Sequence, residues 1–518
     1  MDRDKRFIAL FAIILVLGTA LRLSTLHFGT FMEPDVYGYY SVAQQTIANN
    51  LTITSQLSGF PLHNKFDEMP GLIYFAIAAS YITGNLATAM LFLPVVFAIF
   101  EMAATYMLAY KLSGSRNGGL VAMFLFATMS GAIFKNVAGE WRGESFVPLF
   151  AAAMLLALIY AHERRDKRIY ALSAVPAAFC IWTWSGGVYA IAALLVFFVL
   201  WLLYTKKKSL VLPAVIGAVL LCIGFETFVY FENKGLYLVT NALTTIAELQ
   251  PTTGTFLFLE FGLAIGLAPI GVVFYILKDK YLSNGVPDKK RNNGNFVFLI
   301  ILSLFIVTAA LQLAEIRYMT LIAMPVAVFA SYALLEFYRT RGKTRMRLWV
   351  NIFIASIILV DVIVMFMQVT GYSTGDNISP QFVAAMSWVR NNTSPNATFL
   401  TDWDDGSIVE GLGQRQSYSD SLMGTNDGWQ SFPQFLFAKE GNFSYLMQVK
   451  PDYLLVRQYW RYEIGAFEAE GGMTNISING TNFMALENGS IGLPIVYENN
   501  DTIIYNVSGI VDGKQSTR

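Results

Sequence analysis

The chain has 518 residues, of which 55% are hydrophobic and 14% are charged. A soluble protein of this length has about a quarter charged residues, so this composition excludes a wholly soluble protein and places most of the chain in a membrane. The formal net charge is zero and gives no indication of a nucleic-acid partner.

Apolar runs of membrane-spanning length recur between residues 7 and 370. A spanning helix needs about 20 mostly apolar residues. The first run follows "MDRDKR" and lacks a small-residue cleavage site, so we expect a retained helix and not a signal peptide. The run at 71–84 is too short to span alone and is expected to be re-entrant. The predicted spans are 7–28, 86–110, 118–136, 145–161, 168–184, 186–204, 210–231, 256–277, 295–313, 318–338 and 348–370.

Basic residues cluster in the loops on one side of these spans. The positive-inside rule assigns that side to the cytoplasm, so we expect a multi-pass protein of the cell membrane with a cytoplasmic N-terminus. The basic clusters lie at 2–6, 162–168, 205–208, 278–291 and 339–347, and the predicted external loops are 29–85, 137–144, 232–255 and 314–317.

The composition becomes polar and rich in turn residues after residue 370, and no later run could span a membrane. We therefore predict a transmembrane domain over residues 1–370 and an external soluble domain over residues 371–518. "SPQFVAAMSWVRNN" predicts a helix with a serine N-cap and a proline at its first position. "TFLTDWDDG" and "PDYLLV" predict strands that lead into loops, which makes the domain mixed α/β. Its N-x-S/T sequons, such as the one at Asn442, agree with an exported domain.

Acidic residues recur at the helix ends of the predicted external loops. Asp35 lies in "EPDVYGYY", Glu140 and Glu144 lie in "GEWRGE", and Glu248 ends "TIAE". Carboxylates that converge on one face can hold a hard divalent cation through oxygen ligands. Arg317, in "EIRYM", can bind a phosphate in bidentate fashion. Each residue alone has a simpler interpretation, as a solvated carboxylate or an arginine that reaches for the interface, so the hypothesis depends on the set and its order.

The order of these motifs resembles that of the catalytic subunits of oligosaccharyltransferases, most closely the archaeal AglB branch. "TIAE", from Thr245 to Glu248, matches the family's T-I-x-E motif, and "WTWSGGVYA" at 182–190 is similar to its S-W-G-G-Y helix break. "DWDDG" at 402–406 resembles the W-W-D-Y-G signature, with aspartates in place of its first tryptophan and its tyrosine. Arg142 stands where relatives often have the aspartate of a D-x-E motif. The resemblance implies a polytopic α-helical membrane protein of the GT-C class, with about 11–13 spans, followed by a C-terminal external mixed α/β domain.

The resemblance also implies an enzyme. The family transfers an oligosaccharide from a polyprenyl (dolichyl) phosphate or diphosphate carrier in the membrane to the asparagine of N-x-S/T sequons in acceptor polypeptides. Asp35 and Glu248 would then polarise the acceptor amide. Mn²⁺ or Mg²⁺ would be held by Asp35, Glu144 and Glu248, with Glu140 as an alternative ligand, and would stabilise the leaving phosphate. Arg317 would bind the donor phosphate.

Trp403 and Asp404 are the candidates for recognising the +2 residue of the sequon. Asp404 can accept a hydrogen bond from the Ser/Thr hydroxyl while Trp403 packs on its methyl group, and a site built to bond a hydroxyl rejects analogues that lack it. Without the resemblance, Trp403 would be interpreted as a core aromatic at a strand end. Asp402 and Asp405 are expected to make the acceptor pocket more negative and to weaken the binding of acidic peptides.

Two other classes of function fit parts of the pattern. Another polyprenyl-phosphate-dependent GT-C glycosyltransferase, acting in protein O-glycosylation or lipid modification, would share the acidic first loop but lack the T-I-x-E and Trp-Asp-x-Gly motifs. A transporter would need ionisable residues at the membrane midplane and internal repeats. Glu101 and Glu226 are the few acidic residues near or within the predicted spans, and we rank this function last.

The predicted orientation can be tested with an impermeant maleimide. A cysteine introduced beside Asn442 should react with the reagent in intact cells, because the basic loops place residues 371–518 outside. Labelling that occurs only after lysis would reverse the orientation and move the candidate site to the cytoplasm.

Overall fold

The computed structural model describes residues 3–28, 31–53, 70–206, 251–282, 288–340, 378–421, 432–458 and 477–511, with a few single positions between 352 and 363. The chain divides into two compact units. The first unit consists of Met1–Gly29, Leu91–Glu226 and Pro251–Gly375, and the second consists of Thr30–Met90, Thr227–Gln250 and Asp376–Arg518.

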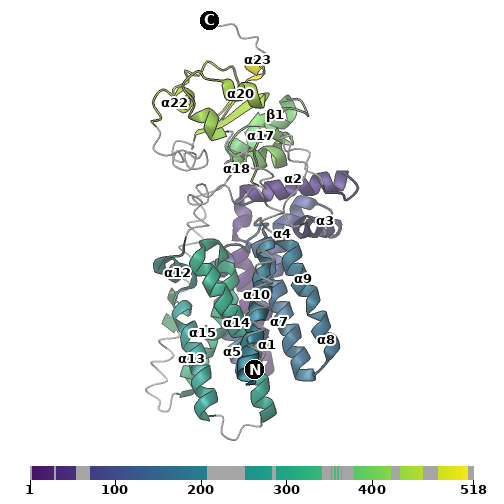
Figure 1. Ribbon diagram of the computed structural model, residues 1–518, viewed down its shortest axis with the longest axis vertical. Coiled ribbons are helices and arrows are strands. Elements are labelled where there is room, and N and C mark those ends of the chain that lie inside the picture. Colours follow the sequence, from purple (N-terminus) through teal and green to yellow (C-terminus); the bar gives the residue numbers. More distant parts are fainter. Residues whose placement is uncertain are drawn as a thin grey trace. The chain divides into compact units, whose positions relative to one another are not determined.

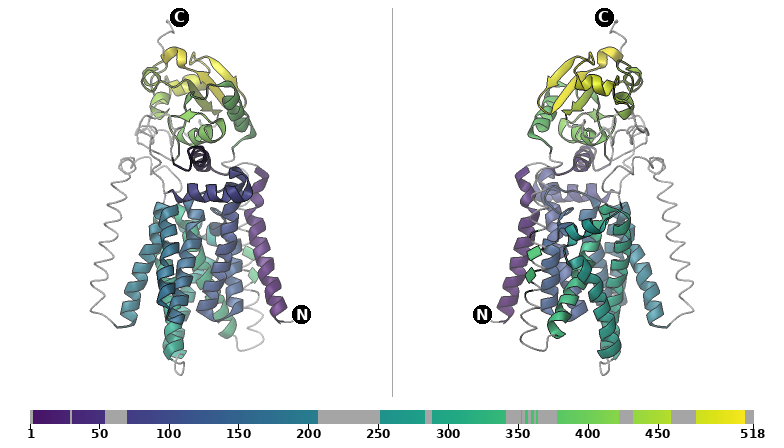
Figure 2. Two further views of the ribbon diagram at one scale, coloured as in Figure 1. Left: turned by 90° about the vertical axis from the view of Figure 1, so that its right-hand side faces the viewer. Right: turned by 90° about the vertical axis from the view of Figure 1, so that its left-hand side faces the viewer.

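The first unit is a bundle of apolar helices (Figures 1 and 2). Several of its large hydrophobic side chains face outward; Ile13 is 61% exposed and Val16 is 68% exposed. This exposure is expected where the surroundings are lipid tails and not water. The helices are α1 (Arg3–Arg22), α4 (Leu86–Ser113), α5 (Arg116–Thr128), α6 (Ser130–Ile133), α7 (Val147–Arg164), α8 (Lys167–Leu172), α9 (Ala174–Thr183), α10 (Val188–Tyr204), α12 (Gly254–Phe261), α13 (Ala264–Leu282), α14 (Asp288–Ala314) and α15 (Met319–Thr340).

Five helical segments of the described chain are long and apolar enough to cross a membrane, and a sixth arises if α12 and α13 count as one bent span. The predicted spans at 210–231 and, for the most part, 348–370 lie outside the described residues. The helices confirm the predicted spans at 7–28, 86–110, 145–161, 295–313 and 318–338.

Three further predicted spans contain a break. Helix α5 ends before Met129, whose extended backbone (φ −69°, ψ 124°) separates it from α6. The helix expected over 168–184 divides at Ser173 into α8 and α9, and Pro176, which lacks an N–H, favours the new helix start. Helices α12 and α13 meet at an angle of 88°, next to Gly262, which has a positive φ of 57°. Each of these three predicted spans is thus divided between two helices.

A buried arginine stabilises the break after α5. The last carbonyl groups of a helix have no partner within the helix and need another donor. The Arg22 guanidinium is fully buried and donates to the carbonyl oxygens of Phe126, Ala127 and Ala132 at 3.5, 3.1 and 3.2 Å. One side chain at the end of α1 therefore satisfies carbonyls on both sides of Met129.

The same end of α1 also anchors the loop that carries Glu140 and Glu144. The backbone N–H of Ala138 donates to the carbonyl of Arg22 at 2.8 Å, and the Thr25 hydroxyl donates to the carbonyl of Ala138 at 2.8 Å. The first span and the second acidic loop are thus joined directly, so the position of that loop depends on α1.

The second unit contains a five-stranded mixed sheet. Its order is β2-β1-β3-β5-β4, with β1 parallel to β2 and β3, and β5 antiparallel to β3 and β4. The strands are β1 (Thr398–Leu400), β2 (Gln416–Ser417), β3 (Tyr453–Arg457), β4 (Ile495–Glu498) and β5 (Thr502–Asn506). The mixed α/β prediction is confirmed, including strands in "TFL" and "YLLV".

Short helices complete the second unit. In α17, the side chain of the N-cap Ser379 accepts a hydrogen bond from the backbone N–H of Phe382 at 2.9 Å, which confirms the predicted cap. The run at 71–84 forms the apolar helix α3, and its re-entrant character stays a prediction. The helices are α2 (Pro34–Ala48), α3 (Gly71–Thr83), α17 (Pro380–Asn392), α18 (Trp403–Ile408), α20 (Ser444–Val449), α22 (Asn482–Glu487) and α23 (Ser508–Val511).

Arg22→Met is expected to destabilise the first unit. The substitution keeps an apolar stem of similar length but removes the donors of buried carbonyl groups, and each group left without a partner costs about 1–3 kcal/mol. The matched control is Arg116→Met, which breaks the exposed ion pair of Arg116 with Asp4 and should leave the protein unchanged. Thermal unfolding midpoints in detergent compare the two variants, and equal midpoints would refute the role assigned to Arg22.

Candidate active site

Asp35 lies in the first turn of α2, one residue after the proline that begins the helix. A carboxylate in this position is favoured by the positive end of the helix dipole. The preceding segment is fixed by Phe31, whose N–H donates to the Tyr37 hydroxyl at 3.2 Å and whose ring meets the Tyr37 ring edge-on at 5.1 Å. These two contacts fix the backbone just before α2, and with it the position of Asp35 in the first turn.

Trp403 and Asp404 form the first turn of α18, directly after Asp402. Gly406 lies in the same helix against the backbone of Ser419, and an added Cβ would lie 1.8 Å from the Ser419 carbonyl oxygen. Any side chain at this position would displace the turn. The glycine that ends "DWDDG" is therefore required by close packing.

Helices α2 and α18 pack against each other within the second unit (Figure 1). The π-helical turn Val409–Gly413 that follows α18 also packs on α2. A Cβ on Gly411 would lie 2.8 Å from the carbonyl oxygen of Tyr37, so this contact is between backbones. Two segments that sequence analysis singled out at opposite ends of the chain, "EPDVYGYY" and "DWDDG", thus belong to one packed unit.

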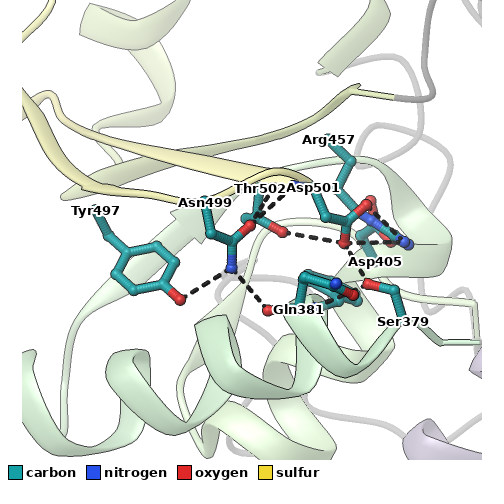
Figure 3. A network of polar contacts seen from close by, with 9 residues as sticks. Ser379, Gln381, Asp405, Arg457, Tyr497, Asn499, Asp501 and Thr502 are labelled. Carbon is teal, nitrogen blue, oxygen red and sulfur yellow. Dashed lines mark hydrogen bonds and ion pairs between the residues drawn. The ribbon is translucent and has the colours of Figure 1, made fainter.

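Asp405 does not carry an uncompensated charge. Its side chain is 1% exposed, and Arg457 on β3 donates to it at 3.0 Å. Arg457 also pairs with Asp501 at 3.3 Å (Figure 3). Arg457 therefore offsets part of the negative charge that Asp405 was expected to add, but it is shared with Asp501. The expectation that Asp402 and Asp405 weaken the binding of acidic peptides stays a prediction.

Burial also acts on a second acidic side chain near α18. Glu410, in the π-helical turn, is buried, and this burial, together with repulsion from Asp420, raises the pKa of its carboxyl group well above the usual range. A carboxyl group of raised pKa tends to keep its proton and adds little negative charge. No motif pointed to Glu410, because its burial follows from the packing of the turn on α2.

In the first unit, Glu144 and Arg317 form a close ion pair. Arg317 Nη2 donates to Glu144 Oε1 at 2.9 Å, and the Glu144 side chain is 3% exposed. The Arg317 guanidinium lies 5.8 Å from the ring centre of Trp184. Gly143 packs on the same ring, since a Cβ there would lie 2.5 Å from the ring atom Cγ of Trp184. Three segments of the sequence resemblance, "GEWRGE", "WTWSGGVYA" and "IRYM", therefore meet here.

Glu140, the alternative metal ligand, lies between two cations. Lys135 Nζ and Arg142 Nε lie 3.4 and 3.5 Å from its Oε1, and its side chain is 2% exposed. Lys135 is fully buried in the apolar run predicted as a span. Sequence analysis missed its pairing with Glu140, because the sequence does not show that the two side chains lie close together. The charge of Glu140 is thus already balanced by protein groups.

The remaining candidate ligand, Glu248, lies outside the described residues. Across the part of the chain that the structure describes, there is no group of three or more His, Cys, Asp or Glu side chains that could hold a metal ion. Carboxylates are suitable ligands for Mn²⁺ or Mg²⁺. The candidate ligands therefore have the donor atoms that such a metal needs. Because Glu248 is not described, the three-ligand site stays a prediction.

No family model matches the sequence, and no curated protein matches it. The fold, however, is similar to solved structures. The Archaeoglobus fulgidus oligosaccharyltransferase tethered with an acceptor peptide containing the NVT sequon matches with a TM-score of 0.72 and 14% identity, over 97% of this chain and 74% of that chain. AglB from the same organism, in complex with an inhibitory peptide and a dolichol-phosphate, matches with a TM-score of 0.69 and 15% identity, over 91% and 72% of the two chains. That oligosaccharyltransferase has also been solved with Zn and sulfate.

ArnT from Cupriavidus metallidurans also matches, with a TM-score of 0.52 and 12% identity, over 98% of this chain and 99% of that chain. These likenesses, together with the apolar helices and the C-terminal mixed sheet, show a polytopic helical membrane protein with a GT-C-like fold. Within that class the chain has the fold of the archaeal oligosaccharyltransferase AglB. The resemblance inferred from the motifs is confirmed at the level of fold.

Proposed function

We propose that the protein is an oligosaccharyltransferase. It transfers an oligosaccharide from a dolichyl phosphate or diphosphate carrier to the asparagine of N-x-S/T sequons in exported polypeptides. The observation that carries this proposal is the packing of α2, with Asp35, against α18, with Trp403 and Asp404, in a fold shared with AglB. The Archaeoglobus structures with an NVT peptide and with a dolichol-phosphate support these two classes of partner.

The chemistry requires activation of a poor nucleophile. The nitrogen of an asparagine amide is unreactive because its lone pair is delocalised into the carbonyl group. Asp35 and Glu248 are the proposed acceptors of the two amide N–H groups, which would localise that lone pair and receive the proton released. The nitrogen then bonds to the anomeric carbon of the donor sugar, and the bond from that carbon to the carrier phosphate breaks.

The leaving phosphate needs positive charge. Arg317 is the proposed donor to it, and its pairing with Glu144 holds the guanidinium in place before the donor arrives. Asp35, Glu144 and Glu248 are the proposed ligands of Mn²⁺ or Mg²⁺, which would act as a Lewis acid toward the phosphate. A complex of the Archaeoglobus enzyme with Zn supports a divalent metal in this fold.

The lipid carrier sets the location and orientation of the reaction. Its tail stays in the bilayer, so the transferred sugar has to meet the acceptor at the membrane surface. We place this surface on the external side, with the N-terminus cytoplasmic and residues 371–518 as the external domain that follows the transmembrane domain at 1–370. The distribution of basic loops supports this orientation.

A second function remains in consideration because ArnT matches nearly its full length to this chain. A GT-C transferase that modifies lipids or glycosylates protein hydroxyl groups would use the same donor class but would not need to recognise a sequon. The TM-score of 0.72 with the peptide-bound oligosaccharyltransferase, against 0.52 with ArnT, favours sequon glycosylation.

Reconstituted transfer distinguishes these functions. Purified protein is incubated with native lipid donor, Mn²⁺ and a fluorescent peptide that contains N-x-T, with an N-x-A peptide as the matched control. A gel shift of the N-x-T peptide alone supports the proposal. Donor consumption without a shift of either peptide would support the lipid-modifying alternative and reject the proposal.

The metal role predicts the effect of chelation and of two substitutions. EDTA should abolish transfer, and Asp35→Ala and Glu248→Ala should each lower its rate by about tenfold or more, because each removes a negative ligand. Re-addition of Mn²⁺ should restore transfer by the EDTA-treated wild-type enzyme. Full transfer in EDTA, after residual metal has been measured, would show that the reaction needs no divalent cation.

The acceptor role predicts a different kinetic pattern for Trp403→Ala and Asp404→Ala. Both should raise the KM for the peptide and abolish the preference for N-x-T over N-x-A, because the hydroxyl loses its acceptor or its packing surface. The KM for the lipid donor should not change. Variants with wild-type peptide KM and selectivity would mean that the acceptor is recognised elsewhere.

A further inference from the structure

We propose that Arg457 is a positioning residue, which holds residues 402–406 in the orientation that acceptor binding requires. The inference rests on the proposed function, because it assigns a purpose to a contact of the candidate acceptor site. It begins from the departure of this chain from the family signature, in which Asp405 replaces a tyrosine. A buried aspartate in that place needs a cation, and the structure provides one from a distant part of the sequence.

The sheet brings Arg457 to the start of α18. Strands β1 and β3 are parallel and paired, with Leu400 beside Leu454, so their carboxyl ends lie at the same edge of the sheet. The chain leaves β1 at this edge and enters residues 402–406, while Arg457 is the last residue of β3. This edge is also where ligands bind in many sheets with parallel strands.

Arg457 contacts three separate elements. It donates to Asp405 in α18 at 3.0 Å and pairs with Asp501, directly before β5, at 3.3 Å. Its guanidinium also stacks 4.1 Å from the ring centre of Phe382 in α17. Asp501 in turn accepts a hydrogen bond from the hydroxyl of Ser379, the N-cap of α17, at 2.7 Å (Figure 3).

Burial makes the contact with Asp405 specific. The Arg457 side chain is 10% exposed and the Asp405 side chain is 1% exposed, so water screens the pair little. Loss of the guanidinium would leave a buried carboxylate without this cation, and the turn could relieve that cost by moving outward to water. Trp403 and Asp404 precede Asp405 directly, so such a movement would displace both acceptor-binding candidates.

The sheet itself does not depend on this ion pair. Its core is apolar and includes the fully buried Leu400, Leu454 and Phe435. Arg457 lies at the end of β3, beyond that core. A variant without the guanidinium should therefore keep the sheet and lose the orientation of the turn, which is what separates a positioning role from a general structural one.

The test compares peptide KM with kcat. Arg457→Met should raise the KM for the N-x-T peptide by about tenfold or more, with kcat at saturating peptide and the KM for the lipid donor close to wild type. Arg457→Lys, which keeps a positive charge, should raise the peptide KM less than Arg457→Met does. The double variant Asp405→Asn with Arg457→Met should bind peptide better than Arg457→Met alone, because it no longer buries a carboxylate that has lost this cation.

The matched control is Lys111→Met. It breaks a partly buried ion pair, Lys111 with Glu163 at 2.5 Å, at the end of α4 in the first unit. This variant should leave the peptide KM unchanged. A similar rise of KM in the control would mean that loss of any ion pair has this effect, and would overturn the specific role of Arg457.

Amide hydrogen exchange provides a readout that needs no activity. Arg457→Met should speed exchange over residues 402–413 and leave exchange in β3 and β5 at the wild-type rate. Unchanged exchange and unchanged KM would overturn the inference, and so would unfolding of both Arg457→Met and Arg457→Lys, since that would make Arg457 a general structural residue. If the wild-type enzyme transfers no glycan to the N-x-T peptide, the proposed function fails, while the exchange measurement still tests whether Arg457 holds the turn.

Discussion

The guanidinium of Arg22 and its hydrogen bonds to backbone carbonyls are the interaction on which the first unit depends. A helix break among buried residues leaves carbonyl groups that water does not reach, so the break persists only where the protein supplies donors. Arg22 supplies them around Met129, and the backbone at the same end of α1 holds the loop that leads to Glu140 and Glu144. The acidic loop of the candidate site is therefore held by the end of the first span, whose residues play no part in the proposed chemistry.

The need for a buried partner recurs at three carboxylates of the described chain. Glu144 meets Arg317, Glu140 lies between two cations, and Asp405 meets Arg457. Each carboxylate was singled out from the sequence as a source of negative charge, and each has a cationic partner in the structure, although Arg457 is shared with Asp501. The charge of the candidate site is thus set by a few ion pairs. A substitution that removes one partner leaves the charge of the other without its counter-charge.

Sequence reasoning succeeded where a local pattern decides the structure. The span at 7–28 is fixed by its apolar length, and the cap at Ser379 by the residues that follow it. It failed at Met129 and Ser173, because tertiary donors and a proline decide whether an apolar run continues as one helix. For the candidate site, the motifs located Glu144, Arg317 and Trp403, whereas Lys135 and Arg457 acquire their roles only from partners that are distant or buried.

The packing of α2 on α18 has a consequence for biosynthesis. The ribosome produces α2 directly after the first span, and nearly the whole membrane bundle is made before α18 exists. During that interval α2 lacks one of its final neighbours, and Tyr37 lacks the turn that packs on it after α18. Chains in this state expose apolar surface and are prone to misassociation. Completion of the second unit is therefore a late step of folding, and it requires that an early segment stay available until residues 402–413 have been synthesised.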